Sequence, residues 1–104
     1  MKDKLLPIFM GKVCEAWRLD KEGLFSNPKE RDYTSARQII WALANYRNIS
    51  GMKITNFMNS EGAEFGYSVT NSTVSKGIRS FWRKMEQDAD LRRIFNTIKD
   101  EKLF

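Results

Sequence analysis

The chain has 104 residues, 41% of them hydrophobic, and its 18 Lys and Arg outnumber its 13 Asp and Glu to give a net charge of +5. This length predicts one domain, residues 1–104, with one hydrophobic core, and this composition excludes a largely disordered chain. The sequence has no His and one Cys, which excludes imidazole catalysis, a disulfide within the chain and a zinc site built from cysteines.

The same features indicate the class of protein to expect. Pro7 and Gly11 interrupt the apolar residues near the N-terminus, so we predict neither a membrane span nor a signal peptide, and a cytoplasmic location. The carboxylates are spread among lysines and arginines, as on solvated faces. We therefore expect no enzyme, no cofactor and no metal site, whereas the positive net charge favours an anionic partner.

The first predicted helix spans residues 4–18, and Pro7 is tolerated in its first turn. Its apolar residues have the spacing of a buried helical stripe, which consists of Leu6, Phe9, Met10, Val13 and Trp17. Gly23 is expected to end this helix or the short turn that follows it. The polar residues 26–35 are expected to form an exposed connection.

Two further helices are predicted in the middle of the chain. One is capped by Thr34 or Ser35 and runs to residue 45 or 47, with Trp41 off its apolar stripe, so this helix should pack on two sides. That stripe consists of Ala36, Ile39, Ile40 and Leu43. A shorter helix is predicted from Ser50 or Gly51 to residue 59.

Residues 59–69 contain glycines and are predicted to form a loop. A weak alternation at Phe65, Tyr67 and Val69 favours a small hairpin within it. A helix capped by Asn71 or Ser72 follows and runs to residue 86. The last helix begins at Asp88 or Asp90, and its inner stripe consists of Leu91, Ile94, Phe95 and Ile98.

The predicted helix over residues 71–86 has two different faces. At about 100° per residue, one side gathers Val74, Ile78, Phe81, Trp82 and Met85. The opposite side gathers Ser72, Lys76, Arg79 and Arg83. Together with the short helix that begins near residue 51, this arrangement is typical of a helix-turn-helix over about residues 51–86.

Such a face suits duplex DNA. Asn can make a bidentate contact with adenine, and cations further along the helix can neutralise phosphates. Each residue type also has a structural interpretation, because Ser and Thr commonly cap helices and a Lys/Arg stripe is commonly a solvated face. Both interpretations are open at this point.

Several motifs resemble one known family. They are "VCEAWRL" (13–19), "LFS" (24–26), "SARQIIWALAN" (35–45), "SGMKITNFM" (50–58) and "TNSTVSKGIRSFWRKM" (70–85). Most of residues 13–98 thereby resembles the C-terminal DNA-binding domain of the bacterial replication initiator DnaA, a helical domain related to the Trp repressor. The resemblance implies an all-α, compact bundle of five or six helices that contains a helix-turn-helix with an enlarged turn.

The resemblance also implies which residues contact DNA. Arg37 and Gln38 match the family's Arg-Gln pair near the DNA backbone, and Lys29, or Arg31 instead, matches an arginine that enters the minor groove. The major-groove positions correspond to Thr70, Asn71, Ser72 and Thr73, and a neighbouring contact corresponds to Lys76. Structural alternatives remain: Arg37 can pair with a carboxylate, Gln38 can be a first-turn helix residue, and Thr73 can bond its own backbone.

The chain also departs from the family pattern. Thr70 and Asn71 stand where the family has Asp-His, which removes an acceptor suited to cytosine and adds a group suited to adenine. The turn over residues 59–69 is about a dozen residues long, where compact units use about 3 or 4. No GxxxxGK phosphate-binding loop occurs in the sequence, so the ATPase part of an initiator has no counterpart here.

The sequence therefore predicts a protein that binds double-stranded DNA, as a small regulator of transcription or replication with a DnaA-like helix-turn-helix. The alternative is a protein-interaction module that binds a replication or transcription factor through exposed aromatic residues and the 59–69 segment. The target sequence and the oligomeric state stay open.

Overall fold

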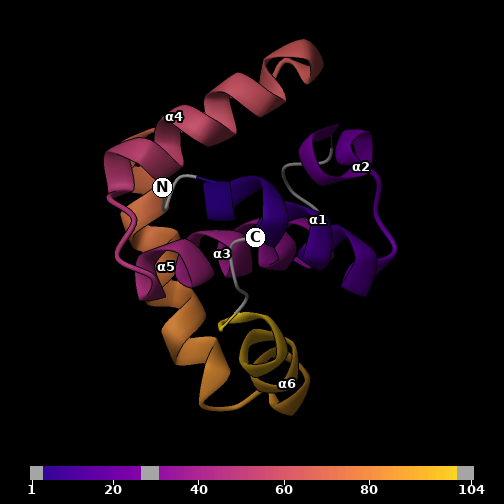
Figure 1. The fold of residues 1–104 in the computed structure, drawn as a ribbon, viewed down its shortest axis with the longest axis vertical. Coiled ribbons are helices and arrows are strands. Elements are labelled where there is room, and N and C mark those ends of the chain that lie inside the picture. Colours follow the sequence, from indigo (N-terminus) through magenta and orange to yellow (C-terminus); the bar gives the residue numbers. More distant parts are fainter. Residues whose placement is uncertain (1–3, 27–30, 101–104) are drawn as a thin grey trace.

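The computed structural model describes residues 4–26 and 31–100, with the side chains of residues 26, 31 and 32 left out of the description. These ranges form six α-helices and a 3-10 helix, η2, and contain no strand (Figure 1). The elements are α1 (Leu5–Trp17), α2 (Lys21–Ser26), α3 (Arg31–Tyr46), α4 (Gly51–Gly62), η2 (Ala63–Phe65), α5 (Asn71–Met85) and α6 (Ala89–Ile98). The expected all-α bundle of five or six helices is confirmed.

Helix α3 forms the centre of the bundle. Every residue from Ala36 to Ala44 is buried, because α1 and α5 pack on it over much of its length and α2, α4 and α6 also contact it (Figure 1). Trp41 is 4% exposed, which confirms that this helix packs on more than one side. A helix buried all round leaves its neighbours to provide the surface of the protein.

The predicted boundaries of the first helices need correction. Helix α1 (Leu5–Trp17) agrees with the predicted range 4–18, but its C-cap is Arg18, in the left-handed conformation at φ 56°, and Gly23 does not end it. Gly23 lies inside α2, where its N–H donates to Asp20 Oδ1 at 2.7 Å. Helix α3 begins at Arg31, so neither Thr34 nor the residue after it is its cap. The Thr34 hydroxyl instead accepts a hydrogen bond from Arg37.

The segment between α4 and α5 differs most from the prediction. Ser50 caps α4 as expected, but the helix continues to Gly62 and leads directly into η2. The expected hairpin in residues 59–69, all of which are described, is absent. The chain reverses at Gly66 (φ 75°) and returns past Gly62, where an added Cβ would lie 2.8 Å from Tyr67 Cβ. The insertion is therefore mostly an extension of α4.

The last two helices begin with side-chain caps and pack on the same core. Thr70 caps α5, one residue before the predicted position, whereas Asp88 caps α6 as predicted. Helix α5 crosses α3 at Gly77, where an added Cβ would lie 2.5 Å from the Trp41 ring. Phe81 of α5 and Phe95 of α6 meet with ring centroids 5.7 Å apart. Over residues 4–26 and 31–100, no helix combines the length and apolar character needed to cross a membrane.

Candidate nucleic-acid interface

The outer face of α5 is exposed along the whole helix. Val74 and Phe81 are buried beneath it and Ile78 is half-buried, which confirms the orientation predicted from the helical period. The exposed residues of this face are Ser72, Lys76, Arg79 and Arg83. We call these four residues the α5 ridge.

Helix α5 itself places no carboxylate beside the cations of the α5 ridge. Helix α5 carries four cations and no carboxylate. Among the described residues, none of Lys76, Arg79 and Arg83 forms an ion pair. A helix face with unpaired cations and no carboxylates attracts polyanions.

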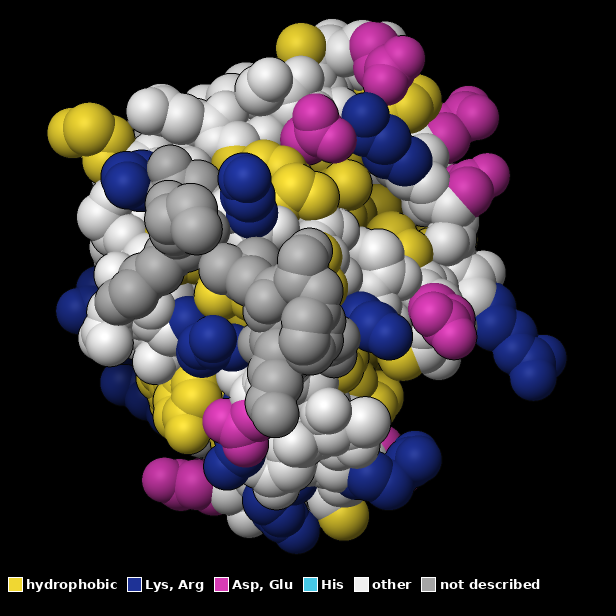
Figure 2. All heavy atoms as spheres, viewed as in Figure 1, with side chains coloured by type: hydrophobic (Ala, Val, Ile, Leu, Met, Phe, Trp, Pro, Cys, Tyr) yellow, Lys and Arg dark blue, Asp and Glu magenta, His cyan; other side chains and the backbone are white. Residues whose placement is uncertain are grey.

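One group of carboxylates lies away from the α5 ridge, whereas Glu86 and Asp88 directly follow α5 in the chain. Figure 2 shows Asp and Glu side chains gathered at the upper right, over α2 and the far end of α4. There Lys21 Nζ lies 3.3 Å from Glu61 and 3.4 Å from Glu64, and hydrogen bonding to Glu61 raises the pKa of Lys21. The protein thus has an acidic end at α2 and η2 and a basic helix at α5.

The first turn of α5 divides the four predicted base-contacting residues into two pairs. Thr70 Oγ1 accepts the Thr73 N–H at 3.2 Å, and the two hydroxyls lie 3.0 Å apart. These two residues therefore hold the helix end. Asn71 and Ser72 are exposed, and their side chains make no hydrogen bond to any described residue. In this turn they are therefore the two side chains available to contact a ligand.

Arg37 lies inside the protein. The resemblance placed it near the DNA backbone, but its side chain is 3% exposed. Its guanidinium donates to the Leu24 carbonyl and to Thr34 Oγ1, and stacks 5.5 Å from the ring centroid of Tyr67. Burial lowers the pKa of Arg37 and raises that of Tyr67. This arginine joins α2, α3 and the segment after η2, a structural role in which its described partners are a carbonyl, a hydroxyl and a ring in place of the carboxylate named above.

Of the other contacts predicted near the start of α3, the structure describes the side chain of Gln38 alone. Gln38 is 9% exposed, and its Oε1 accepts a hydrogen bond from Lys84 Nζ at 3.0 Å, so the amide joins α3 to α5. Arg31 is the first residue of α3, and its side chain lies outside the description. Lys29 lies outside the described residues altogether.

A groove of about 410 Å³ runs beside the α5 ridge, between α3, residues 67–69 and α5. Lys76 lies at its edge, and its hydroxyl-bearing lining residues include Ser68, Thr73 and Ser80, while none of its lining residues is a carboxylate. Sequence reasoning missed Ser68 and Ser80, because residues so far apart in the chain share no visible pattern. Gly77, a glycine in the middle of an amphipathic helix, was the available signal of a close approach there.

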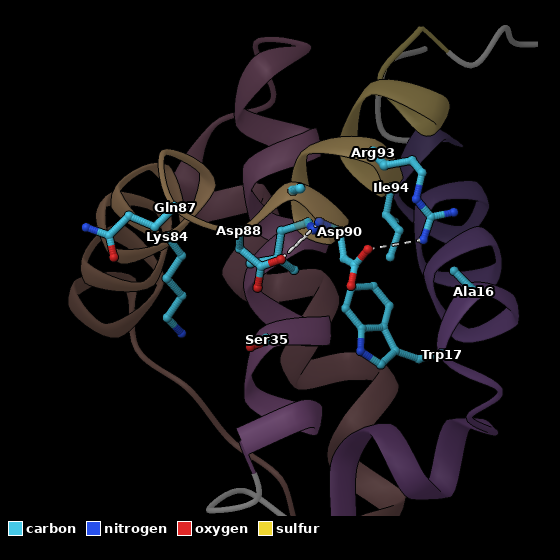
Figure 3. Close-up of a pocket in the computed structure, with 11 residues that line it drawn as sticks. Ala16, Trp17, Ser35, Lys84, Gln87, Asp88, Asp90, Arg93 and Ile94 are labelled. Carbon is cyan, nitrogen blue, oxygen red and sulfur yellow. Dashed lines mark hydrogen bonds and ion pairs between the residues drawn. The ribbon is translucent and has the colours of Figure 1, made fainter.

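A second cavity, of about 750 Å³, lies where α1, α3, α5 and α6 meet (Figure 3). Its charged groups have both signs and are already engaged. Asp88 Oδ1 accepts from the backbone N–H of Asp90 and of Leu91, and Asp90 lies 3.6 Å from Arg93. A polyanion is therefore better matched by the carboxylate-free groove beside the α5 ridge.

Comparisons with known proteins add no identification. No protein-family model matches the chain, and neither a curated protein nor a solved structure shows significant similarity to it. Within the described part of the chain, no three Asp, Glu or Cys side chains come together as metal ligands would.

Proposed function

We propose that this chain binds double-stranded DNA by placing α5 in the major groove, as a small regulator of transcription or replication. The observation that carries the proposal is the exposed, carboxylate-free α5 ridge above a buried apolar underside. In this proposal α4 and α5 form a helix-turn-helix like that of the DnaA domain, with its turn enlarged by the extension of α4 and by η2.

Dimensions and chemistry support this docking. The 15 residues of α5 span about 22 Å at 1.5 Å per residue, and a major groove about 12 Å wide admits an α-helix. Lys76, Arg79 and Arg83 recur at one turn spacing, which suits successive phosphates along a groove wall. The groove lined by Ser68 and Ser80 offers hydroxyl donors to a backbone strand beside the helix.

The first turn of α5 supports recognition of adenine. Because Thr70 and Thr73 are bonded to each other, base contacts fall to Asn71 and Ser72 in this proposal. The carboxamide of Asn71 matches the N6 and N7 edge of adenine with one donor and one acceptor. We therefore expect a preferred site that contains adenine and differs from the box that DnaA recognises.

Selection of bound duplexes from a random pool, followed by titration at two salt concentrations, tests the proposal. The double variant Lys76→Ala/Arg79→Ala should bind the selected duplex much more weakly, and the slope of log K against log salt should fall by about 1.8, or 0.9 per lost phosphate contact. The control, Lys4→Ala/Lys12→Ala, removes the same charge from exposed positions of α1 and its start and should bind nearly as wild type. Equal losses in both variants would contradict the docking.

The rival function is binding of a replication or transcription protein. Some of the residues that suggested it make contacts within the chain: Phe65 and Tyr67 pack on Phe25, with ring centroids 6.1 and 5.1 Å from its own, and Glu61 pairs with Lys21 at the surface. These contacts favour the DNA proposal. Co-purification of a specific protein, together with no enrichment of any duplex, would favour the rival.

A further inference from the structure

The connection between α4 and α5 contains a pair of hydrogen bonds from one side chain to one peptide unit. Asn59, half-buried on α4, accepts the Val69 N–H through Oδ1 at 2.7 Å and donates from Nδ2 to the Val69 carbonyl at 3.0 Å. One carboxamide thus satisfies both backbone groups of Val69, as a neighbouring strand would do. We call this the Asn59–Val69 pair.

The Asn59–Val69 pair holds the end of the returning chain next to α5. Further back, the return is held at Tyr67, whose N–H donates to the Gly62 carbonyl at 3.0 Å and whose ring packs on Phe25. Ser68 is exposed, and Thr70 follows Val69 directly as the N-cap of α5. The place and direction of the first turn of α5 therefore depend on a side chain from α4.

We infer that Asn59 is a positioning residue for base recognition by the first turn of α5, a role that rests on the proposed function. Asn59 does not touch DNA in this proposal. It fixes Val69, Val69 fixes the Thr70 cap, and the cap sets the direction in which Asn71 and Ser72 leave the helix.

Base contacts are the interactions that such positioning serves. A short side chain such as Asn71 makes a bidentate contact only when its backbone lies within about 0.5 Å of the required place. Lys76 and Arg79 reach phosphates through long side chains, which tolerate a larger displacement. Loss of the Asn59–Val69 pair should therefore reduce discrimination between sequences more than it reduces binding to DNA in general.

The variant Asn59→Ala tests this division, with Asn96→Ala as a matched control at an exposed position of α6. Affinity is measured for the selected duplex and for an unrelated duplex at two salt concentrations. Asn59→Ala should bind the selected duplex about tenfold more weakly, near the lower range of one bidentate base contact, with unchanged affinity for the unrelated duplex and an unchanged salt slope. Asn96→Ala should keep the wild-type ratio.

A measurement without DNA separates positioning from mere stability. Amide chemical shifts and hydrogen exchange in folded Asn59→Ala should change at Val69 and through Thr70–Thr73. If Asn59→Ala does not fold, Asn59→Asp provides the same readouts, because it keeps the acceptor for the Val69 N–H and loses the donor to its carbonyl.

Two outcomes overturn the inference, and a third concerns the proposed function. If the amide chemical shifts and exchange rates of Thr70–Thr73 are unchanged in a folded variant, Asn59 does not position this turn, even if the wild type binds DNA. The inference would also fail if the amide signals of Thr70–Thr73 shift in a variant that still has the wild-type ratio of affinities for the selected and the unrelated duplex. A wild-type protein that binds no duplex would instead remove the proposed function, and base recognition by this turn with it.

Discussion

Helices α3 and α5 cross at Gly77 and both carry arginines on polar stretches of sequence, but they use them in opposite ways. In α3, Arg37 is buried, and its guanidinium donates hydrogen bonds to Leu24 and Thr34 and lies over the ring of Tyr67. In α5, Arg79 and Arg83 are exposed and form no ion pair within the described residues. The difference teaches that an arginine's place in a motif does not reveal its role until its burial is known.

The largest effect is expected from a substitution that forces α3 and α5 apart where they cross. Gly77→Val would place side-chain atoms against the Trp41 ring, where even a Cβ lies 2.5 Å from ring carbon, so we expect the free energy of unfolding to fall by about 3 kcal/mol. Chemical denaturation followed by circular dichroism measures this change.

Gly11→Val is the control for helix propensity. An added Cβ at Gly11 meets no atom within 4 Å, and Val is a slightly better helix former than Gly, so stability should change by less than about 0.5 kcal/mol. Similar losses in the two variants would show that the crossing with Trp41 is not the cause.

Smaller effects on stability are expected when one arginine is removed from each helix, and the two losses should differ. Arg37→Ala should lower the free energy of unfolding by about 2 kcal/mol, because it leaves the buried Leu24 carbonyl without this donor. Arg79→Ala should change it by less than about 0.5 kcal/mol, as for other exposed positions.

The effects of these two variants on DNA binding should be reversed. Folded Arg37→Ala should keep the wild-type salt slope, whereas Arg79→Ala should lower it by about 0.9. If instead Arg37→Ala lost a phosphate contact by this measure, the buried guanidinium would have to reach DNA after a rearrangement of α3.

The smallest expected effect concerns the ring that covers Arg37. Burial raises the pKa of Tyr67 above its ordinary value of 10.0, so the folded protein holds this proton more tightly than the unfolded chain does. The resulting stability is fully present below pH 10.0 and is lost as the pH rises through the folded pKa. Tyr67→Phe should lessen this fall in urea denaturation between pH 9 and 11, and an equally steep fall in the variant would contradict the assignment to Tyr67.

Local patterns predicted the helices better than the connections. The stripe that includes Phe9 and Val13 and the caps Ser50 and Asp88 depend on neighbours within one or two turns, and the structure confirms them. The range of α1 was predicted to within one residue, but its ending residue was not, because left-handed Arg18 has a conformation that few arginines adopt. The return of residues 66–70 depends on Asn59, about ten residues earlier, which no local pattern connects to Val69.

The candidate interface was predictable only where one helix carries it. The α5 ridge follows from the 3.6-residue period, and its exposure is as expected. The buried position of Arg37 and the hydroxyl-lined groove with Ser80 depend on how separate segments meet, which a single sequence does not state. The base-contacting role of Asn71 stays a prediction.

The carboxylates around Lys21, at α2 and η2, lie apart from helix α5, which carries cations and no carboxylate. In the proposed association with DNA, the negative field of the duplex would favour an approach with α5 in front and α2 behind. In the proposed complex the carboxylates around Lys21 would then face outward from the duplex, and a second macromolecule approaching the bound protein would meet a surface of opposite sign to the one that met the DNA.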